Sequence, residues 1–129
     1  MRKRILVADD SELIRQQVRR ILEPDQQVEI CAEADNGMDA VRKTREHRPD
    51  LVVIDIFMPQ MSGLEAVREI RKTSPHLPVA VLTLHDSGGI RAESEKVGAD
   101  AFLLKANASA ELLPTIHSLL RRNSEPITA

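Results

Sequence analysis

The chain has 129 residues, of which 42% are hydrophobic and 29% are charged. A domain of this length buries roughly two thirds of the surface that its unfolded chain exposes, so we expect one domain with a real core. Eighteen basic and twenty acidic residues give a net charge of −2, which offers no electrostatic basis for direct nucleic-acid or membrane binding. No apolar stretch reaches membrane-spanning length. Only four apolar residues follow Arg2-Lys3-Arg4, too few for an export signal, which favours a cytoplasmic location.

Short apolar runs alternate with amphipathic segments along the chain, and this alternation is typical of an α/β domain with a parallel sheet covered on both faces by helices. Helical spacing of apolar residues is clearest between Ile14 and Leu22 and between Leu112 and Leu120. The segment from Ser87 to Val97 is the weakest helix, because it begins with two glycines and has few apolar residues. The apolar runs predict five strands: Arg4–Ala8, Val28–Ala34, Leu51–Asp55, Val79–Thr83 and Ala101–Leu104.

The predicted domain spans residues 1–122. Residues 123–129 show no periodicity and are expected to form a C-terminal tail or linker. The single cysteine, Cys31, lies in the second predicted strand, where a buried and unreactive thiol is expected.

Five polar residues stand at the C-terminal ends of four predicted strands: Asp9, Asp10, Asp55, Thr83 and Lys105. Because the C-terminal ends of parallel strands open onto one crevice, we expect these side chains to share a pocket. Carboxylates about 5 Å apart repel one another by about 3 kcal/mol per pair at an effective dielectric near 20, so such a cluster favours a bound cation. Oxygen ligands at a site that also meets a phosphate indicate Mg²⁺.

A carboxylate beside such an ion can act as a nucleophile toward phosphorus. Lys105 would neutralise a phosphoryl oxygen and Thr83 would donate a hydrogen bond to another. Each residue also has a structural alternative: Asp9 or Asp10 could cap the first helix, and Asp55 could end a strand. The joint occurrence of all these residues at four strand ends favours a functional site over four separate structural roles.

Four motifs together resemble the receiver domain of two-component response regulators: Ala8-Asp9-Asp10, Asp55-Ile56-Phe57-Met58-Pro59 with Gly63, Thr83, and the run from Gly98 to Lys105. The resemblance extends from Arg4 to about Arg122. It implies a flavodoxin-like, doubly wound fold with five parallel strands in the order 2-1-3-4-5 and five helices.

The resemblance also implies a role for each acid. Asp55 would be the phosphoacceptor, taking a phosphoryl group from a sensor histidine kinase or a phosphotransfer protein. Asp10 would be a direct Mg²⁺ ligand, Asp9 would act through water, and the backbone carbonyl of Phe57 would be a further ligand. Such a domain catalyses only its own phosphorylation and dephosphorylation, so it is not expected to be an enzyme.

Thr83 and Phe102 resemble the switch pair of the family, in which the hydroxyl moves toward the phosphate and the aromatic ring turns inward. The surface of the fourth helix, fifth strand and fifth helix would then change shape and meet a partner or a second copy. Ala106 stands where the family usually has proline. Phe57 and Leu84 are bulky, and we predict that they restrict water and lengthen the lifetime of the acyl phosphate; His85 lies at the predicted rim.

Three other functions remain as alternatives. A pseudo-receiver would have the fold without phosphorylation. A Mg²⁺-dependent phosphatase with an aspartyl nucleophile usually has a second acid two residues later, where Phe57 stands. A flavodoxin-type carrier would need aromatic residues around its flavin, and the chain has no Trp or Tyr. From Ser62 onward the sequence is similar to receivers that precede helix-turn-helix DNA-binding domains, which favours a receiver excised from such a regulator over a free-standing one.

Overall fold

Strands and helices alternate along the chain as the sequence pattern predicts. The computed structural model describes residues 1–124. The strands are β1 (Lys3–Ala8), β2 (Val28–Ala34), β3 (Leu51–Ile54), β4 (Val79–Thr83) and β5 (Ala101–Leu104). The helices are α1 (Glu12–Leu22), α2 (Gly37–His47), α3 (Gly63–Thr73), α4 (Ile90–Lys96), the 3₁₀ helix η1 (Lys105–Asn107) and α5 (Ala108–Ser124).

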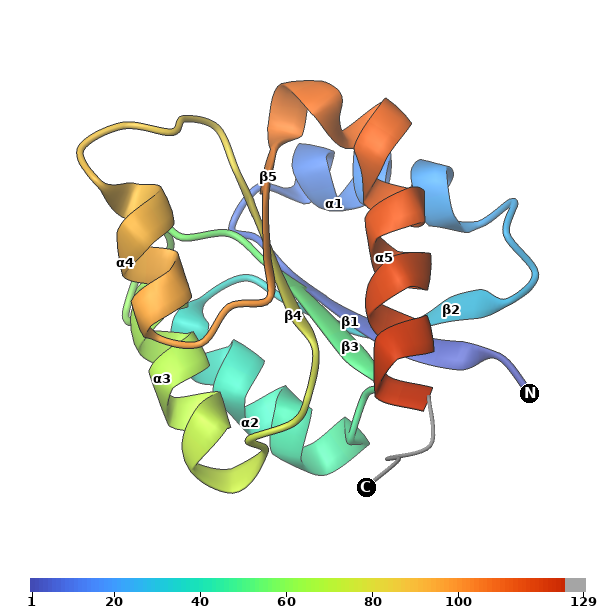
Figure 1. Ribbon diagram of the computed structural model, residues 1–129, viewed down its shortest axis with the longest axis horizontal. Coiled ribbons are helices and arrows are strands. Elements are labelled where there is room, and N and C mark those ends of the chain that lie inside the picture. Colours follow the sequence, from blue (N-terminus) through green and yellow to red (C-terminus); the bar gives the residue numbers. More distant parts are fainter. Residues whose placement is uncertain (125–129) are drawn as a thin grey trace.

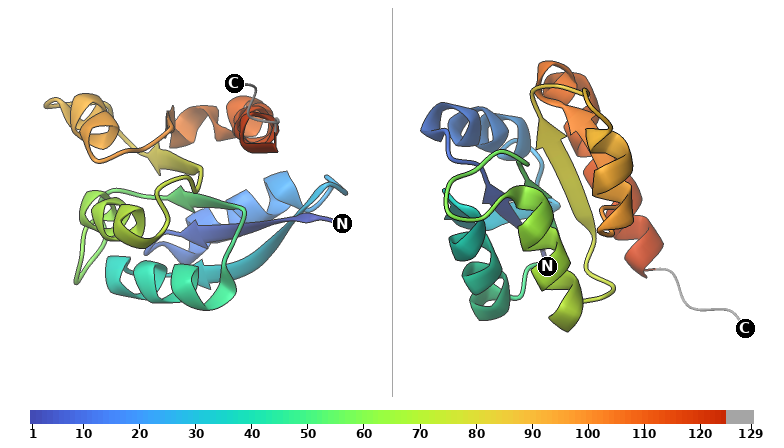
Figure 2. Two further views of the ribbon diagram at one scale, coloured as in Figure 1. Left: turned by 60° about the horizontal axis from the view of Figure 1, so that its bottom comes forward. Right: turned by 90° about the vertical axis from the view of Figure 1, so that its left-hand side faces the viewer.

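All five strands pair in parallel in the order β2-β1-β3-β4-β5, which confirms the predicted topology (Figure 1). Alternate side chains of each strand face opposite sides of the sheet. On one side, Ile5 and Val7 pack with residues of α1 and α5. On the other side, Leu6 and Ala8 pack with residues of α2 and α3, and Figure 2 shows these helices on the side of the sheet opposite α5. The three central strands are buried almost throughout because both of their faces are covered.

Three helices begin with a side-chain cap placed shortly after a strand end. The side chains of Ser11, Asn36 and Ser62 accept hydrogen bonds from backbone N–H groups in the first turns of α1, α2 and α3. The first helix is therefore capped by Ser11, and the alternative that Asp9 or Asp10 caps it is wrong. Helix α4 begins at Gly89 without a side-chain cap.

Four details differ from the sequence expectations or refine them. The third strand ends at Ile54, so Asp55 lies just beyond it. Helix α4 has seven residues instead of the eleven predicted, and α5 continues to Ser124, past the expected domain boundary. Cys31 is half-buried rather than buried, because β2 is an edge strand. Its partial burial nevertheless raises the pKa of the thiol.

Two further observations concern the described part of the chain. Its peptide bonds are all trans, including the one between Lys105 and Ala106. None of the helices within residues 1–124 is both long and apolar enough to cross a bilayer. Residues 125–129, most of the predicted tail, lie outside the described residues.

Candidate phosphoacceptor site

The two buried acids are brought together by the pairing of neighbouring strands. Ala8 at the end of β1 is paired with Ile54 at the end of β3, so the next residues, Asp9 and Asp55, emerge side by side. The Asp55 N–H donates to the Ala8 carbonyl at 2.9 Å, which extends the strand pairing by one residue. The side chains of Asp9 and Asp55 are almost fully buried. Parallel strand register therefore fixes the spacing of these carboxylates before any ligand is bound.

Asp10 completes an acidic cluster at this edge of the sheet. One carboxylate oxygen from each of Asp9, Asp10 and Asp55 lies within 4.8 Å of the others. Asp10 is exposed, whereas the other two acids are buried. Since all three donors are carboxylate oxygens, the cluster is able to hold a hard metal ion. The structure thus brings together the three acids that the sequence placed in one pocket.

The side chain of Lys105, which follows β5, forms ion pairs with the two buried acids. Its Nζ atom lies 2.7 Å from Asp9 Oδ2 and 3.4 Å from Asp55 Oδ2, and its side chain is only 10% exposed. Lys105 follows β5, which is separated from β3 by β4, so its long side chain crosses the end of the sheet. A buried ammonium between two buried carboxylates leaves the cluster with a net negative charge.

Burial raises the pKa of the Asp55 carboxyl above its ordinary range, and the neighbouring Asp9 carboxylate raises it further. The Lys105 ammonium and the Ile56 N–H, which donates to Asp55 Oδ1 at 2.8 Å, lower the pKa without cancelling the rise. The ionised form of Asp55 is thus disfavoured in the structure as it stands. A cation at the cluster would restore the ionised form, which is the form that can act as a nucleophile.

Thr83 and Phe102 lie on the same face of the sheet. Val81 is paired with Phe102 and Thr83 with Leu104, so the hydroxyl and the ring occupy neighbouring positions of β4 and β5. Thr83 is fully buried, and within the described residues its Oγ1 has no hydrogen-bond partner. A buried hydroxyl without a partner is unfavourable, and an acceptor brought to it would remove that cost. Phe102 is half-buried against the core beneath α4.

The model of the response regulator receiver domain matches residues 5–117 of the chain. The chain belongs to this family. The receiver is 35% identical over 120 residues to the transcriptional regulatory protein YdfI of Bacillus subtilis (strain 168), covering 93% of the receiver and 56% of that protein. It is 42% identical over 122 residues to the response regulator MprA of Mycobacterium sp. (strain KMS), covering 94% of the receiver and 52% of MprA. The receiver thus spans about half the length of these curated relatives.

Solved structures agree with this assignment. A LuxR-family two-component response regulator from Aurantimonas sp. SI85-9A1 superimposes with a TM-score of 0.89 at 30% identity, covering 95% of the receiver and 87% of that chain. The CheX–CheY complex with BeF₃ and Mg from Borrelia burgdorferi gives a TM-score of 0.84 at 25% identity, with coverage of 91% and 88%. Fold, family and acidic cluster therefore point to the same class of protein.

Two exposed apolar residues stand shortly after the ends of β3 and β4. Phe57, in the loop after β3, is 60% exposed, and Leu84, directly after β4, is 61% exposed. His85 is exposed in the same β4–α4 loop. The loop arches away from the sheet near the start of α5, at the upper end of the view in Figure 1. Control of water access by these residues stays a prediction.

The structure explains why position 63 is occupied by glycine, which the motif alone did not reveal. A Cβ atom at Gly63 would lie 1.9 Å from the Asp55 carbonyl oxygen. The Gly63 N–H also donates to the Ile56 carbonyl at 2.7 Å. The first turn of α3 therefore packs directly on the backbone that carries the phosphoacceptor candidate, and only glycine leaves the room for it.

Arg15 is a site residue that sequence reasoning missed. Its guanidinium donates to the Asp9 backbone carbonyl and pairs with Glu12 and, at 3.0 Å, with Glu33. It thereby fixes the backbone of a buried acid to α1 and β2. The spacing of Glu12 and Arg15 predicts an ion pair within the helix, but nothing in the sequence indicates the contact with Asp9.

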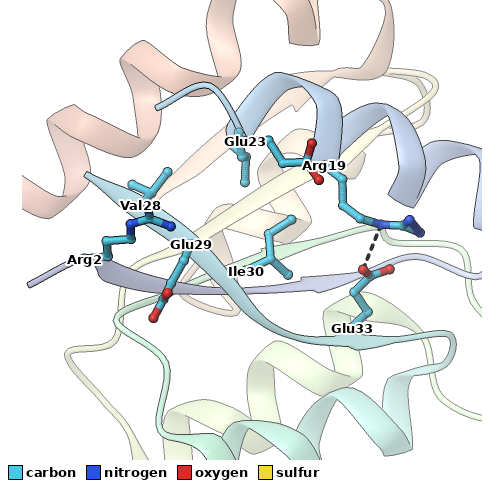
Figure 3. Close-up of a pocket in the computed structure, with 8 residues that line it drawn as sticks. Arg2, Arg19, Glu23, Val28, Glu29, Ile30 and Glu33 are labelled. Atoms are coloured by element: carbon cyan, nitrogen blue, oxygen red, sulfur yellow. Dashed lines mark ion pairs between the residues drawn. The ribbon is translucent and has the colours of Figure 1, made fainter. Parts of the chain in front are cut away.

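A separate cavity of about 300 Å³ lies between α1 and β2 (Figure 3). Arg19 and Glu33, two of the lining residues, form the ion pair drawn in Figure 3, with Nε and Oε2 2.9 Å apart. The wall also contains Leu22, Val28 and Ile30. None of the three clustered acids lines this cavity, so it is distinct from the candidate site.

Proposed function

We propose that this receiver accepts a phosphoryl group on Asp55 from the phosphohistidine of a sensor histidine kinase or phosphotransfer protein. The supporting observation is the convergence of a buried Asp55, two further acids and the Lys105 ammonium at one edge of the sheet. A pseudo-receiver has no need of this arrangement. A phosphatase with an aspartyl nucleophile would need a second acid two residues after Asp55, and the exposed Phe57 occupies that position.

Each side chain has a distinct part in the transfer. An oxygen of the ionised Asp55 carboxylate attacks phosphorus, a P–O bond forms, and the P–N bond to the donor histidine breaks. Lys105 moves with the developing charge and pairs with one phosphoryl oxygen. The unpartnered Thr83 hydroxyl donates to another, which satisfies a group that is otherwise buried without a partner.

Magnesium is the metal that best suits the cluster. The donors are all oxygens, one acid is exposed to water, and the site must also accept a phosphoryl group. Asp10 and Asp55 would bind the ion directly, Asp9 would bind it through water, and the Phe57 carbonyl would be a further ligand. The bound ion would neutralise charge on the acids and on the phosphoryl oxygens. The similar Borrelia CheY, whose structure contains Mg and BeF₃, supports this choice.

The exposed rim residues set how long the phosphoryl group stays. Phe57 and Leu84 are large, exposed apolar residues close in sequence to Asp55 and Thr83, and apolar groups at the entrance would slow the approach of the water that hydrolyses an acyl phosphate. His85 lies one residue further along the same loop and is able to contact a bound phosphoryl oxygen.

The output of the receiver is the regulation of transcription through a DNA-binding domain outside this chain, after residues 123–129. Support comes from relatives named as a transcriptional regulatory protein and as a DNA-binding response regulator of the LuxR family, the latter from Staphylococcus aureus at 33% identity and a TM-score of 0.83. Phosphorylation would alter the face formed by α4, β5 and α5, where a second copy would bind to form a homodimer. Because bacterial DNA is cytoplasmic, this proposal includes a cytoplasmic location.

Intact mass spectrometry after incubation with acetyl phosphate and Mg²⁺ tests the proposal. We expect wild-type receiver to gain the mass of one phosphoryl group and Asp55→Asn to gain none. Asp25→Asn, which removes an acid between α1 and β2, is the matched control and should gain one phosphoryl group as wild type does. An adduct that persists unchanged in Asp55→Asn would reject the assignment.

A further inference from the structure

The ring of Phe102 is covered by a cation from α4. The Arg91 guanidinium carbon lies 4.5 Å from the centroid of the ring, within the distance at which a cation is attracted to an aromatic face. The Nε atom of the same guanidinium lies 3.2 Å from Asp86 Oδ2 in the β4–α4 loop. We refer to Asp86, Arg91 and Phe102 as the Arg91 clasp. The clasp joins the loop, the helix and β5.

The apolar contacts of α4 with the core are confined to its two ends, where Ile90 and the C-cap residue Val97 pack. Ser94 is the only buried residue within its seven residues, and the Ser94 hydroxyl donates to the Arg91 carbonyl at 2.8 Å. The N-cap residue of the helix is Gly89, which has a left-handed φ of 78° and provides no side-chain cap. A Cβ atom at Gly88 or Gly89 would meet no atom within 4 Å, so the preceding loop is open. A helix with so few buried contacts opens locally at low free energy, so the clasp adds to the apolar contacts that hold it.

We propose that Arg91 is a positioning residue that holds Phe102 in its half-exposed position and so opposes the switch. This inference rests on the proposed function, in which Thr83 moves toward the phosphoryl group and the ring turns inward. Thr83 and Phe102 share one face of the sheet, and α4 covers the same face. To turn inward, the ring must leave the guanidinium or draw Arg91 and the Asp86 loop with it.

The clasp couples ring position to phosphorylation in both directions. A cation–π contact at an exposed site shifts an equilibrium by about two- to fivefold. Loss of Arg91 therefore raises the ratio of inward to outward rings by about that factor. Linkage requires that a state favoured by the bound phosphoryl group or its mimic in turn favours their binding. We further propose that phosphoryl transfer proceeds through the inward-ring state, so that a larger population of this state raises the phosphorylation rate by up to the same factor.

The chain allows the ring to be observed directly, because Phe57 and Phe102 are its only phenylalanines and it has no Trp or Tyr. Receiver labelled with ring-¹³C phenylalanine gives signals from two rings, and Phe57→Leu assigns them. Spectra are recorded for the free protein and after addition of beryllofluoride and Mg²⁺, a stable mimic of the phosphoryl group. The rate of phosphorylation by acetyl phosphate is measured on the same samples.

We expect the Phe102 signal of free Arg91→Gln to move toward its beryllofluoride-bound position, with phosphorylation about two- to fivefold faster. Arg91→Lys, which keeps the cation, should return both readouts toward wild type. Asp86→Asn, which only releases the guanidinium from the loop, should give a smaller change of the same sign. Lys96→Gln removes a positive charge from the other end of α4 and should match wild type in both readouts.

The two proposals fail in different ways. If neither wild type nor any variant forms an adduct, the proposed function is overturned, and the clasp with it. If wild type forms the adduct but Arg91→Gln matches it in Phe102 signal and rate, the clasp alone is overturned. Equal changes in Arg91→Gln and Lys96→Gln would also overturn the clasp, because helix charge rather than the ring contact would then be responsible.

Discussion

Replacing Asp55 with asparagine should stabilise the metal-free receiver while abolishing its phosphorylation. The Asp55 side chain is 6% exposed, and burial together with Asp9 raises the pKa of its carboxyl. Its ionised form therefore opposes folding at neutral pH, although Lys105 partly compensates. Asparagine has nearly the same shape without the charge. Stability and activity should thus change in opposite directions at this one position.

The magnitude follows from the geometry. At an effective dielectric near 20, Lys105 at 3.4 Å attracts the carboxylate by about 5 kcal/mol, and Asp9 at up to 4.8 Å repels it by about 3.5 kcal/mol. The exposed Asp10 adds about 1 kcal/mol of repulsion in water-like surroundings. These contributions nearly cancel, which leaves the burial penalty of the ion, several kcal/mol in real proteins. Because the amide of asparagine must also be buried, we expect a net gain of about 2 kcal/mol.

Urea unfolding at several pH values, with and without Mg²⁺, measures this gain. A raised carboxyl pKa means that the folded state binds a proton more tightly, so its stability contribution is lost as pH rises through the raised value. The advantage of Asp55→Asn should be absent below about pH 4 and grow above it. Mg²⁺ should stabilise wild type more than the variant.

Asp10→Asn is the matched control. It removes an exposed acid from the same cluster, and we expect it to gain less than about 1 kcal/mol. An Asp55→Asn protein that is less stable than wild type without metal at neutral pH would refute the electrostatic reasoning.

Three further predictions concern other parts of the receiver. His117 Nε2 lies 2.6 Å from Asp25 Oδ2 and lowers the pKa of that carboxyl. The contribution of this pair to folding stability is therefore fully present above about pH 4 and is lost as the pH falls through the lowered pKa. Asp25→Asn should therefore lower the urea midpoint at neutral pH and flatten its acid dependence, and an unchanged acid dependence would contradict this. The double variant Phe57→Asn/Leu84→Ala should release phosphate from the phosphorylated receiver faster than wild type. A release rate that is unchanged or slower would reject the prediction that these two side chains restrict the access of water. Gly63→Ala should destabilise the fold by about 3 kcal/mol, because its Cβ would lie 1.9 Å from a carbonyl oxygen; a wild-type midpoint would contradict the packing argument.

The strands and the members of the site could be predicted from local sequence patterns, whereas the strand order 2-1-3-4-5 was implied by the resemblance to receiver domains. Apolar runs identify the strands, and parallel pairing places the residues after them at one edge. Asp9 and Asp55 follow paired residues, so their proximity needs no knowledge of side-chain conformation. Predicting that Lys105 belongs to the site required only that the strand before it lie in the same sheet.

Contacts made by long side chains could not be predicted in the same way. Arg15 reaches the Asp9 carbonyl, and Arg91 lies over Phe102, but arginine has many rotamers and several acceptors lie within its reach. Cys31 was expected to be buried because its strand is apolar; its exposure depends on β2 being at the edge of the sheet. Helix capping by Ser11 rather than a neighbouring acid was decided by a difference of one or two residues.

Locating the phosphoryl group tests the central claim most directly. Borohydride reduces an acyl phosphate to an alcohol, so a phosphorylated aspartate becomes homoserine, which peptide mass spectrometry identifies by position. After reaction with acetyl phosphate and Mg²⁺, we expect homoserine at Asp55 and at no other acid. Homoserine at Asp9 or Asp10, or a phosphorylated receiver in which Asp55 is unmodified, would contradict the account.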